Sequence, residues 1–312
     1  ISENIKTSNS YLTLQWFYVN KLTFALIAFI ATFALLINIH VIDLKSIYND
    51  ISDEFISLGA LSDADKALAI ETNEQDKNKK YKGIGLDPLN ELVLLSEAGI
   101  GSMLQNRSRL HPSIASWLSP EVHIADGING ASGVRQGGRL LLFTKINQVV
   151  DAIQKKIKEL QKGTDRKIYI FILSGLSGGT GSGCFLDIAY ITRAILDLEA
   201  GGSGIDRSDI MGYLFTPDVN LANPSLSIHT QEYIKKNGYA ALKELDYWMN
   251  IEERGEHFKQ DYGTRLSVDL QVPPFDLCHL ISATDTEGKT IHNAYDYCMN
   301  VTAENITNFM AS

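Results

Sequence analysis

A glycine-dense turn between a predicted strand and a predicted helix constrains this chain more than any other stretch. The apolar, β-rich run Ile168 to Leu173 leads into the turn, which extends from Gly175 to Gly183, and apolar residues recur at helical spacing from Cys184 to Leu198. A strand, a glycine loop and a helix in this order aim backbone N–H groups and a helix N-terminus at an anion. Glycine suits the turn because it reaches positive φ and lets a phosphate approach the main chain. We therefore expect a phosphate-binding loop, because an ordinary tight turn leaves the four glycines among residues 178–183 unexplained.

The residues after the glycines exclude two common phosphate loops. Gly178 and Gly183 have the GxxxxG spacing of a Walker A loop, but Cys184 stands where that loop carries its lysine. A dinucleotide-binding GxGxxG motif starting at Gly179 would also need a glycine at Cys184. The other glycine pair, GIGLDP at 83–88, lacks the third glycine, so a Rossmann-type oxidoreductase is poorly supported.

A second glycine-rich segment precedes another predicted helix. Residues 127–138 are expected to form a loop, and Arg139 to open a long helix towards Leu160, because apolar residues recur there near the 3.6-residue period. Gly163 is expected to close that helix. Two such loops at one edge of a parallel sheet would contact a nucleotide from two sides.

The remaining elements alternate between strand and helix patterns. We expect a strand with an acidic turn in 53–68, a helix over Asp87 to Ala98, a connection over 99–120, a strand over Ile210 to Phe215, a helix over Asn237 to Met249, a strand over Leu277 to Ser282 and a final helix over 292–310. This alternation predicts an α/β fold with a doubly wound, mostly parallel sheet flanked by helices.

Composition limits the classes of function. A hydrophobic share of 45% and a charged share of 21% are those of an ordinary globular chain, and 312 residues can hold one large or two modest domains. The net charge of −9 argues against nucleic acid as a partner. The three cysteines have no metal-site spacing and the histidines are scattered, so we assign no metal ligand and no catalytic residue.

The N-terminal segment, residues 1–52, is distinct from the predicted nucleotide-binding domain at 53–312. Residues 22–42 form a run of 21 without Asp, Glu, Lys or Arg, long enough to span a bilayer. Two interpretations stay open: a membrane anchor, or a buried strand and helix that replace the start of the domain.

Five segments, in order, resemble bacterial tubulin-like proteins of the tubulin/FtsZ superfamily. They are FISLGALSDADKAL (55–68), DGINGASGVRQGGR (126–139), SGGTGSG (177–183), LFTPDVN (214–220) and NGYAALKEL (237–245). The resemblance covers roughly residues 53 to 311. It implies a guanine nucleotide, GTP or GDP with Mg²⁺, and self-association into a head-to-tail polymer or oligomer in the bacterial cytoplasm, at the inner membrane if residues 22–42 are an anchor.

Carried over onto the matching positions, the resemblance also implies the contacts of the nucleotide. The phosphate contacts fall on Ser177, Gly178, Gly179, Thr180, Gly181 and Ser182. The γ-phosphate side falls on Gly127, Asn129, Gly130, Ala131 and Gly133. Asp63 and Asp65 would approach Mg²⁺ through water, and Pro217 and Asp218 the ribose. The base pocket would draw on Thr284, Asn293 or Tyr295.

Two departures from the family pattern suggest an alternative. The family begins with a strand and a GxGGxG-like loop, but this chain has a glycine-free apolar segment there. The sequence also stops before the acidic loop that serves GTP hydrolysis in the family, and so resembles a truncated domain. The alternative to a GTP-binding domain is a degenerate scaffold that self-associates without nucleotide.

Overall fold

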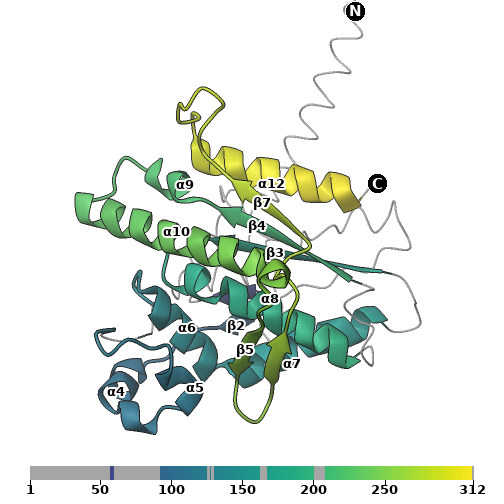
Figure 1. Cartoon of the computed structure of the whole chain (residues 1–312). Helices are drawn as coiled ribbons and strands as arrows, with labels where there is room; N and C mark the ends of the chain where they lie inside the picture. Colours follow the sequence, from purple (N-terminus) through teal and green to yellow (C-terminus); the bar gives the residue numbers. More distant parts are fainter. Residues whose placement is uncertain are drawn as a thin grey trace, which may run out of the picture.

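A computed structural model of the chain describes residues 57–59, 92–124, 127, 130–161, 167–199 and 208–310. The main sheet is parallel, with the strand order β3 (Ile168–Gly175), β4 (Ser208–Phe215) and β7 (Leu277–Ile281) (Figure 1). A short parallel pair joins β1 (Ser57–Gly59) to β2 (Leu92–Leu94). An antiparallel hairpin is formed by β5 (Phe258–Asp261) and β6 (Ser267–Leu270). The predicted α/β fold with a parallel sheet and flanking helices is confirmed.

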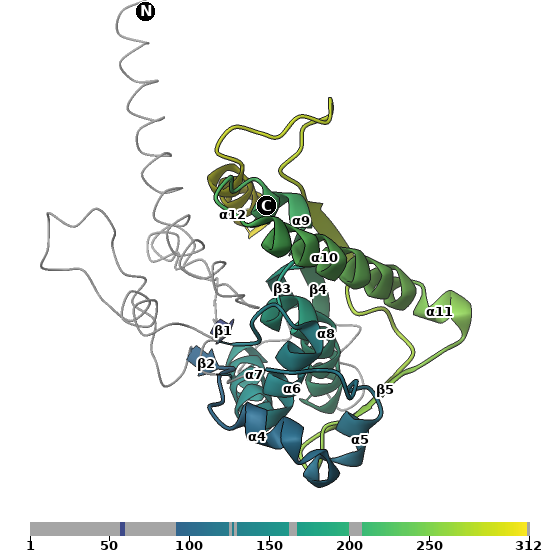
Figure 2. The same ribbon diagram turned by 90° about the vertical axis from the view of Figure 1, so that its left-hand side faces the viewer.

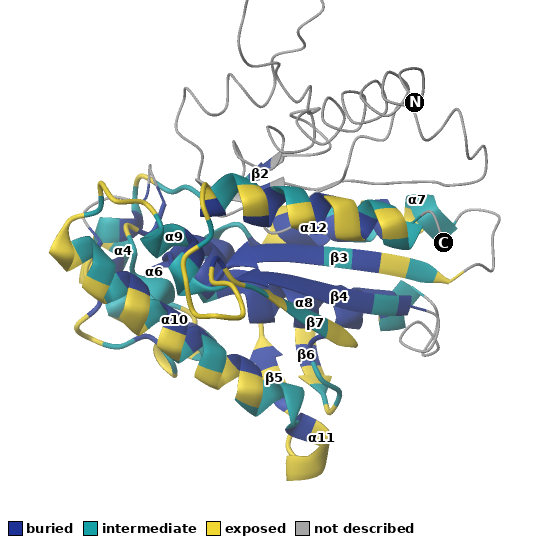
Figure 3. Cartoon of the chain, turned by 90° about the horizontal axis from the view of Figure 1, so that it is seen from above, coloured by how far each residue is buried: buried dark blue, intermediate teal, exposed yellow. Residues whose placement is uncertain are grey.

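Helices cover both faces of the main sheet. Side chains of a strand alternate between its two faces, and in β4 Ile210 and Leu214 join the core beside α8 (Thr180–Glu199), whereas Met211 and Tyr213 join the core beneath α12 (Ala294–Met310). Figure 3 shows β3 and β4 largely buried, with α12 on one side of them and α8 on the other. This arrangement makes α8 a central helix, most of whose residues are buried.

The other helices surround this centre. They are α4 (Ile100–Gln105), the 3₁₀ turn η1 (Arg107–Arg109), α5 (Pro112–Ala115), α6 (Arg135–Thr144), α7 (Ile146–Gln161), α9 (Pro217–Leu221), α10 (Ile228–Met249) and α11 (Ile251–Arg254). Both α6 and α7 pack on α8, and Figure 2 shows them on the same side of the sheet.

The long helix predicted from Arg139 to Leu160 was wrong in two respects. Helix α6 begins earlier, at Arg135, so Gly137 and Gly138 are helical rather than part of a loop. A Cβ on Gly138 would lie 2.2 Å from the carbonyl oxygen of Gly179, so this glycine permits close helix packing. The helix is also interrupted at Lys145, whose ammonium group forms an ion pair with Glu97 (2.8 Å), a tertiary contact that periodicity does not reveal.

The helix predicted over Asp87 to Ala98 was also wrong. Residues 92–94 form the strand β2, with Val93 and Leu95 buried. A short apolar run fits a buried strand as well as a helix, and pairing with β1 decided between them. The expected connection over 99–120 contains α4, η1 and α5, and the β5–β6 hairpin was not predicted.

Several expectations fall on residues outside the described part of the chain. These include the apolar run 22–42, the domain boundary at 52, the start of the predicted helix at Asp87, and Gly163. Among the helices that the structure describes, none has the length and apolar character needed to cross a bilayer.

Candidate functional site

The site lies where the three parallel strands end together. Gly175 of β3 pairs with Phe215 of β4, which in turn pairs with Ile281 of β7, so the loops that follow the strands start side by side. The carboxyl ends of parallel strands are the usual place for ligands in open α/β sheets. The loop after β3, residues 176–179, leads directly into α8 at Thr180.

The β3–α8 loop carries buried polar groups that have no hydrogen-bond partner in the part of the chain that the structure describes. For the N–H groups of Ser177, Gly178 and Gly179 the structure gives no acceptor among the described residues. At the start of α8 the N–H of Gly183 donates to the carbonyl of Gly179 (3.0 Å), the hydrogen-bond spacing of an α-helix. The hydroxyl oxygen of Ser177 is buried and also unpartnered. Buried donors without acceptors are costly, so this loop is suited to an anion.

The loop at 130–134 packs directly against the β3–α8 loop. The N–H of Ala131 donates to the hydroxyl of Thr180 at 3.4 Å. A Cβ on Gly179 would lie 2.8 Å from both the Cβ of Ala131 and the backbone nitrogen of Val134, so a side chain at this position would separate the two loops. The chain turns here through left-handed backbone at Gly130 (φ 85°) and Gly133 (φ 81°). The two glycine segments therefore meet, as their sequence positions suggested.

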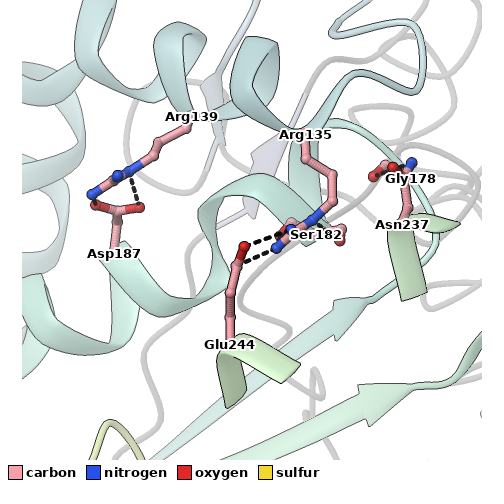
Figure 4. A network of polar contacts seen from close by, with 7 residues as sticks. All are labelled: Arg135, Arg139, Gly178, Ser182, Asp187, Asn237 and Glu244. Carbon is pink, nitrogen blue, oxygen red and sulfur yellow. Dashed lines mark hydrogen bonds and ion pairs between the residues drawn. The ribbon is translucent and has the colours of Figure 1, made fainter. Parts of the chain in front are cut away.

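Helix α10 contributes one side chain that contacts both loops. The Nδ2 of Asn237 donates to the carbonyl oxygens of Gly133 (2.8 Å), Ser177 (3.0 Å) and Gly178 (3.3 Å). Figure 4 shows this amide beside Gly178. The next residue, Gly238, is buried. A Cβ there would lie 1.9 Å from the Cγ of Pro217, so glycine at this position lets α10 lie against the start of α9.

Arg135 joins the starts of α6 and α8 to α10. Its Nε donates to the hydroxyl of Ser182 (2.8 Å), and a terminal nitrogen donates to the Ser182 carbonyl (2.9 Å). The same guanidinium group pairs with both carboxylate oxygens of Glu244 at 2.8 and 2.5 Å (Figure 4). A bidentate pair of this kind fixes orientation as well as distance.

Arg139 forms a more buried pair with Asp187 on α8. Two hydrogen bonds of 2.8 Å join them, and Tyr262 donates to the same carboxylate (2.5 Å). Burial by itself would lower the pKa of Arg139, but the Asp187 carboxylate outweighs it and the pKa lies above its usual value. The guanidinium group also lies 4.5 Å from the ring centre of Trp117. This network ties α6, α8 and the hairpin together behind the loops.

Cys184 occupies the position at which a Walker A loop has lysine. Its thiol is fully buried and donates to the carbonyl of Gly138 at 3.2 Å. Burial raises the pKa of this thiol well above its usual value, so it stays neutral. Its role is to pack α8 against α6.

On the predicted ribose side, the carboxylate of Asp218 is held by the loop after β7. It accepts hydrogen bonds from the Ser282 hydroxyl (2.6 Å), the Ala283 N–H (2.8 Å) and the Thr284 hydroxyl (2.9 Å), and from Thr216. Burial raises the pKa of Asp218, but these hydrogen bonds outweigh it and the pKa lies below its usual value. The carboxylate is therefore ionised and links the ends of β4 and β7.

The predicted base side lies at the start of α12. Asn293 has left-handed backbone (φ 51°), and its side chain donates to Asp296 (2.6 Å). The hydroxyl of Tyr295 is buried without a partner, and burial raises its pKa. Both residues follow the loop after β7.

Three predicted contacts, Asn129, Asp63 and Asp65, fall outside the described residues. Gly127 is described and forms a bridge with Glu97 (3.1 Å), next to the 130–134 loop. No group of three His, Cys, Asp or Glu that could hold a metal occurs among the residues described.

Asn237, Arg135 and the Arg139–Asp187 pair were not predicted as parts of this site. Their partners lie far away along the chain, and spacing cannot reveal such contacts. The only signal was the Asn-Gly pair inside a strongly helical segment, since glycine within a helix usually marks a close approach.

A protein-family model described as tubulin like matches residues 44–312. A comparison with curated proteins finds no match.

Proposed function

The chain belongs to the tubulin-like family, and on that basis we propose that it binds a guanine nucleotide through its two glycine loops and self-associates. The observation that carries the proposal is the meeting of the β3–α8 loop and the 130–134 loop. Between β3 and α8, the amides of residues 177–179 have no acceptor among the described residues.

The chain's own groups fit a polyphosphate. Backbone N–H groups at a helix N-terminus carry partial positive charge and need no lysine to hold an anion. Glycine at 179 keeps the two loops in contact, and the buried hydroxyl of Ser177 offers one further donor. In this proposal Ser177 to Ser182 contact the phosphates. The residues that approach the γ-phosphate are Gly127, Asn129, Gly130, Ala131 and Gly133.

The rest of the nucleotide is assigned to the neighbouring loops. Pro217 and Asp218 lie on the ribose side, and Asn293 and Tyr295 on the base side. The ionised Asp218 accepts hydrogen bonds from its own chain, so its part is to hold this edge in place. Mg²⁺, approached through water by Asp63 and Asp65, would supply charge neutralisation for the phosphates when bound.

For the complete protein we propose GTP hydrolysis coupled to self-assembly. We assign no catalytic residue in this chain. From the family resemblance we propose the bacterial cytoplasm, where GTP is available, as the compartment.

The direct test is calorimetric titration with GTP, GDP and ATP in the presence of Mg²⁺. We expect binding of GTP and GDP with a clear preference over ATP, and light scattering that rises with protein concentration when GTP is added. Absence of guanine preference at millimolar ligand would overturn the proposal. Self-association without any nucleotide binding would instead support the degenerate scaffold.

A further inference from the structure

The side-chain amide of Asn237 faces three main-chain carbonyl groups that belong to two different loops. Its Nδ2 lies 2.8 Å from the oxygen of Gly133, 3.0 Å from that of Ser177 and 3.3 Å from that of Gly178. One amide nitrogen carries two hydrogens, so at least one of them is shared between carbonyls. The contact joins α10 to the 130–134 loop and the β3–α8 loop at a single point.

These contacts determine which way the neighbouring N–H groups point. In a trans peptide unit the carbonyl oxygen and the following N–H lie on opposite sides of the C–N bond. Because the carbonyls of Ser177 and Gly178 turn towards Asn237, the N–H groups of Gly178 and Gly179 turn away from α10. These are two of the three loop amides for which the described residues provide no acceptor.

If the carbonyl oxygen of Ser177 or Gly178 pointed away from Asn237, it would face the phosphate and repel it. In a glycine-rich segment the peptide planes rotate easily, because no Cβ restricts them. Something outside the loop must therefore hold the carbonyls away from the anion. Of the side chains that the structure describes, Asn237 is the one that donates to the carbonyls of both Ser177 and Gly178.

We propose that Asn237 is a positioning residue of the nucleotide site: it binds the carbonyls of Ser177, Gly178 and Gly133 and thereby aims the Gly178 and Gly179 amides at the polyphosphate. This inference rests on the proposed function. Asn237 touches the loops and not the ligand. Its position depends on Gly238, which lets α10 lie against Pro217.

A purely structural role for Asn237 would have a different consequence. Loss of a structural contact weakens the fold and lowers affinity for every ligand of the site. Loss of the positioning contact weakens only the part of the ligand that the amides hold, the phosphates. A comparison of ligands with and without phosphate therefore separates the two roles.

The experiment measures affinities of the wild-type chain and of Asn237→Leu for GDP, inorganic pyrophosphate and guanosine by calorimetry, with Mg²⁺ present. We expect Asn237→Leu to lose about tenfold or more in affinity for GDP and pyrophosphate, the size of one or two lost hydrogen bonds. Its affinity for guanosine should stay within about twofold of wild type. Asn237→Ala removes the same donors with less steric change, carries the same expectation, and decides the matter if Asn237→Leu does not fold.

Asn250→Leu is the matched control. Asn250 is the residue that caps the C-terminus of α10, and its side chain donates to the carbonyl of Asp246 (2.7 Å) and to neither loop. This variant should bind all three ligands as the wild type does. Asn237→Gln, which keeps the donor one methylene further out, should recover part of the affinity for GDP.

The outcomes separate the inference from the proposed function. Equal loss for guanosine and pyrophosphate, or no loss for either phosphate ligand in a folded Asn237 variant, would overturn the positioning role. Binding of pyrophosphate without guanine preference in the wild type would overturn the proposed function, while the variants would still test Asn237. If the wild type binds neither GDP nor pyrophosphate, both are wrong.

Discussion

At the scale of single residues, the site depends on glycines, which have no side chain to keep neighbouring segments apart. Gly179 lets the two loops touch, and Gly138 lets α6 lie against the same backbone from the other side. Any Cβ at these positions would meet main-chain atoms, which cannot rotate away as a flexible side chain can. The effect of a substitution here should therefore reach both loops.

We predict that Gly179→Ala weakens guanine-nucleotide binding by about tenfold or more and destabilises the fold by about 1–3 kcal/mol, as overpacking generally does. The added Cβ would lie 2.8 Å from Ala131 and would push the 130–134 loop away. Calorimetric titration and urea unfolding measure the two effects. Gly99→Ala is the control, because its Cβ would meet only Glu97 at 3.7 Å. Equal behaviour of the two variants would contradict the prediction.

Asp218 provides a prediction about pH. Its folded-state pKa lies below the ordinary value of 3.8, because four hydrogen bonds favour the ionised form. A lowered folded-state pKa contributes stability that is present at neutral pH and is lost as the pH falls below about 4. Asp218→Asn should therefore be less stable than wild type at pH 7, by about 1 kcal/mol given partial exposure. The difference should shrink in urea unfolding at pH 3, and a constant difference would argue against it.

At the scale of elements, α8 is held at its start and at its middle. Arg135 binds Ser182 in the first turn, and Arg139, one turn further along α6, binds Asp187. Tyr262, just beyond β5, completes the second contact. The helix whose N-terminus faces the predicted phosphate is thus fixed from α6, α10 and the hairpin, so its amides keep one direction.

We predict that Arg139→Met lowers the free energy of unfolding by about 3 kcal/mol, because it leaves the Asp187 carboxylate buried with its charge unpaired. Arg265→Met is the matched control. Arg265 pairs with Asp151, whose side chain is 62% exposed, so its loss should cost at most about 1 kcal/mol. Urea unfolding of both variants gives the comparison. Similar losses in the two would show that Arg139 and Asp187 contribute no more than a surface pair.

At the scale of the whole molecule, the proposed site draws its residues from the ends of three strands, from the 127–134 segment and from α10. The strands β3, β4 and β7 end in register, and their loops carry the phosphate, ribose and base assignments in that order. A ligand bound there would contact segments from Gly127 to Tyr295. Binding of the ligand would then raise the free energy of unfolding of the entire fold.

We predict that GDP at a hundred times its dissociation constant stabilises the chain by about 2.7 kcal/mol and raises the melting temperature by roughly 4 °C. ATP at the same concentration should produce a much smaller shift, and Gly179→Ala, with about tenfold weaker binding, should reduce the GDP shift to about half or less. Differential scanning calorimetry measures all three. Equal shifts with GDP and ATP would argue against a guanine site.

The local order of the chain could be predicted from its residues. Three successive features depend on neighbours within a few positions, so their pattern is visible in the sequence: the apolar run that ends at Leu173, the glycine turn and the apolar helix that follows it. The same holds for β4, β7, the second half of α10 and α12, and the family match supports the motif resemblance. The strand β2 was not visible, because its pairing with β1 involves distant residues. The break between α6 and α7 at Lys145 has no signal in the local apolar spacing.

The sequence by itself determined that this is an α/β chain with two glycine turns before helices and no Walker lysine, because these features are local. Only the tertiary structure decided that the two turns touch, that Gly137 and Gly138 serve helix packing, and that Asn237 joins both loops. The physical reason is that a hydrogen bond or a close approach between residues 133, 178 and 237 depends on how the helices pack. Packing is a property of the whole core, and no short stretch of sequence contains it.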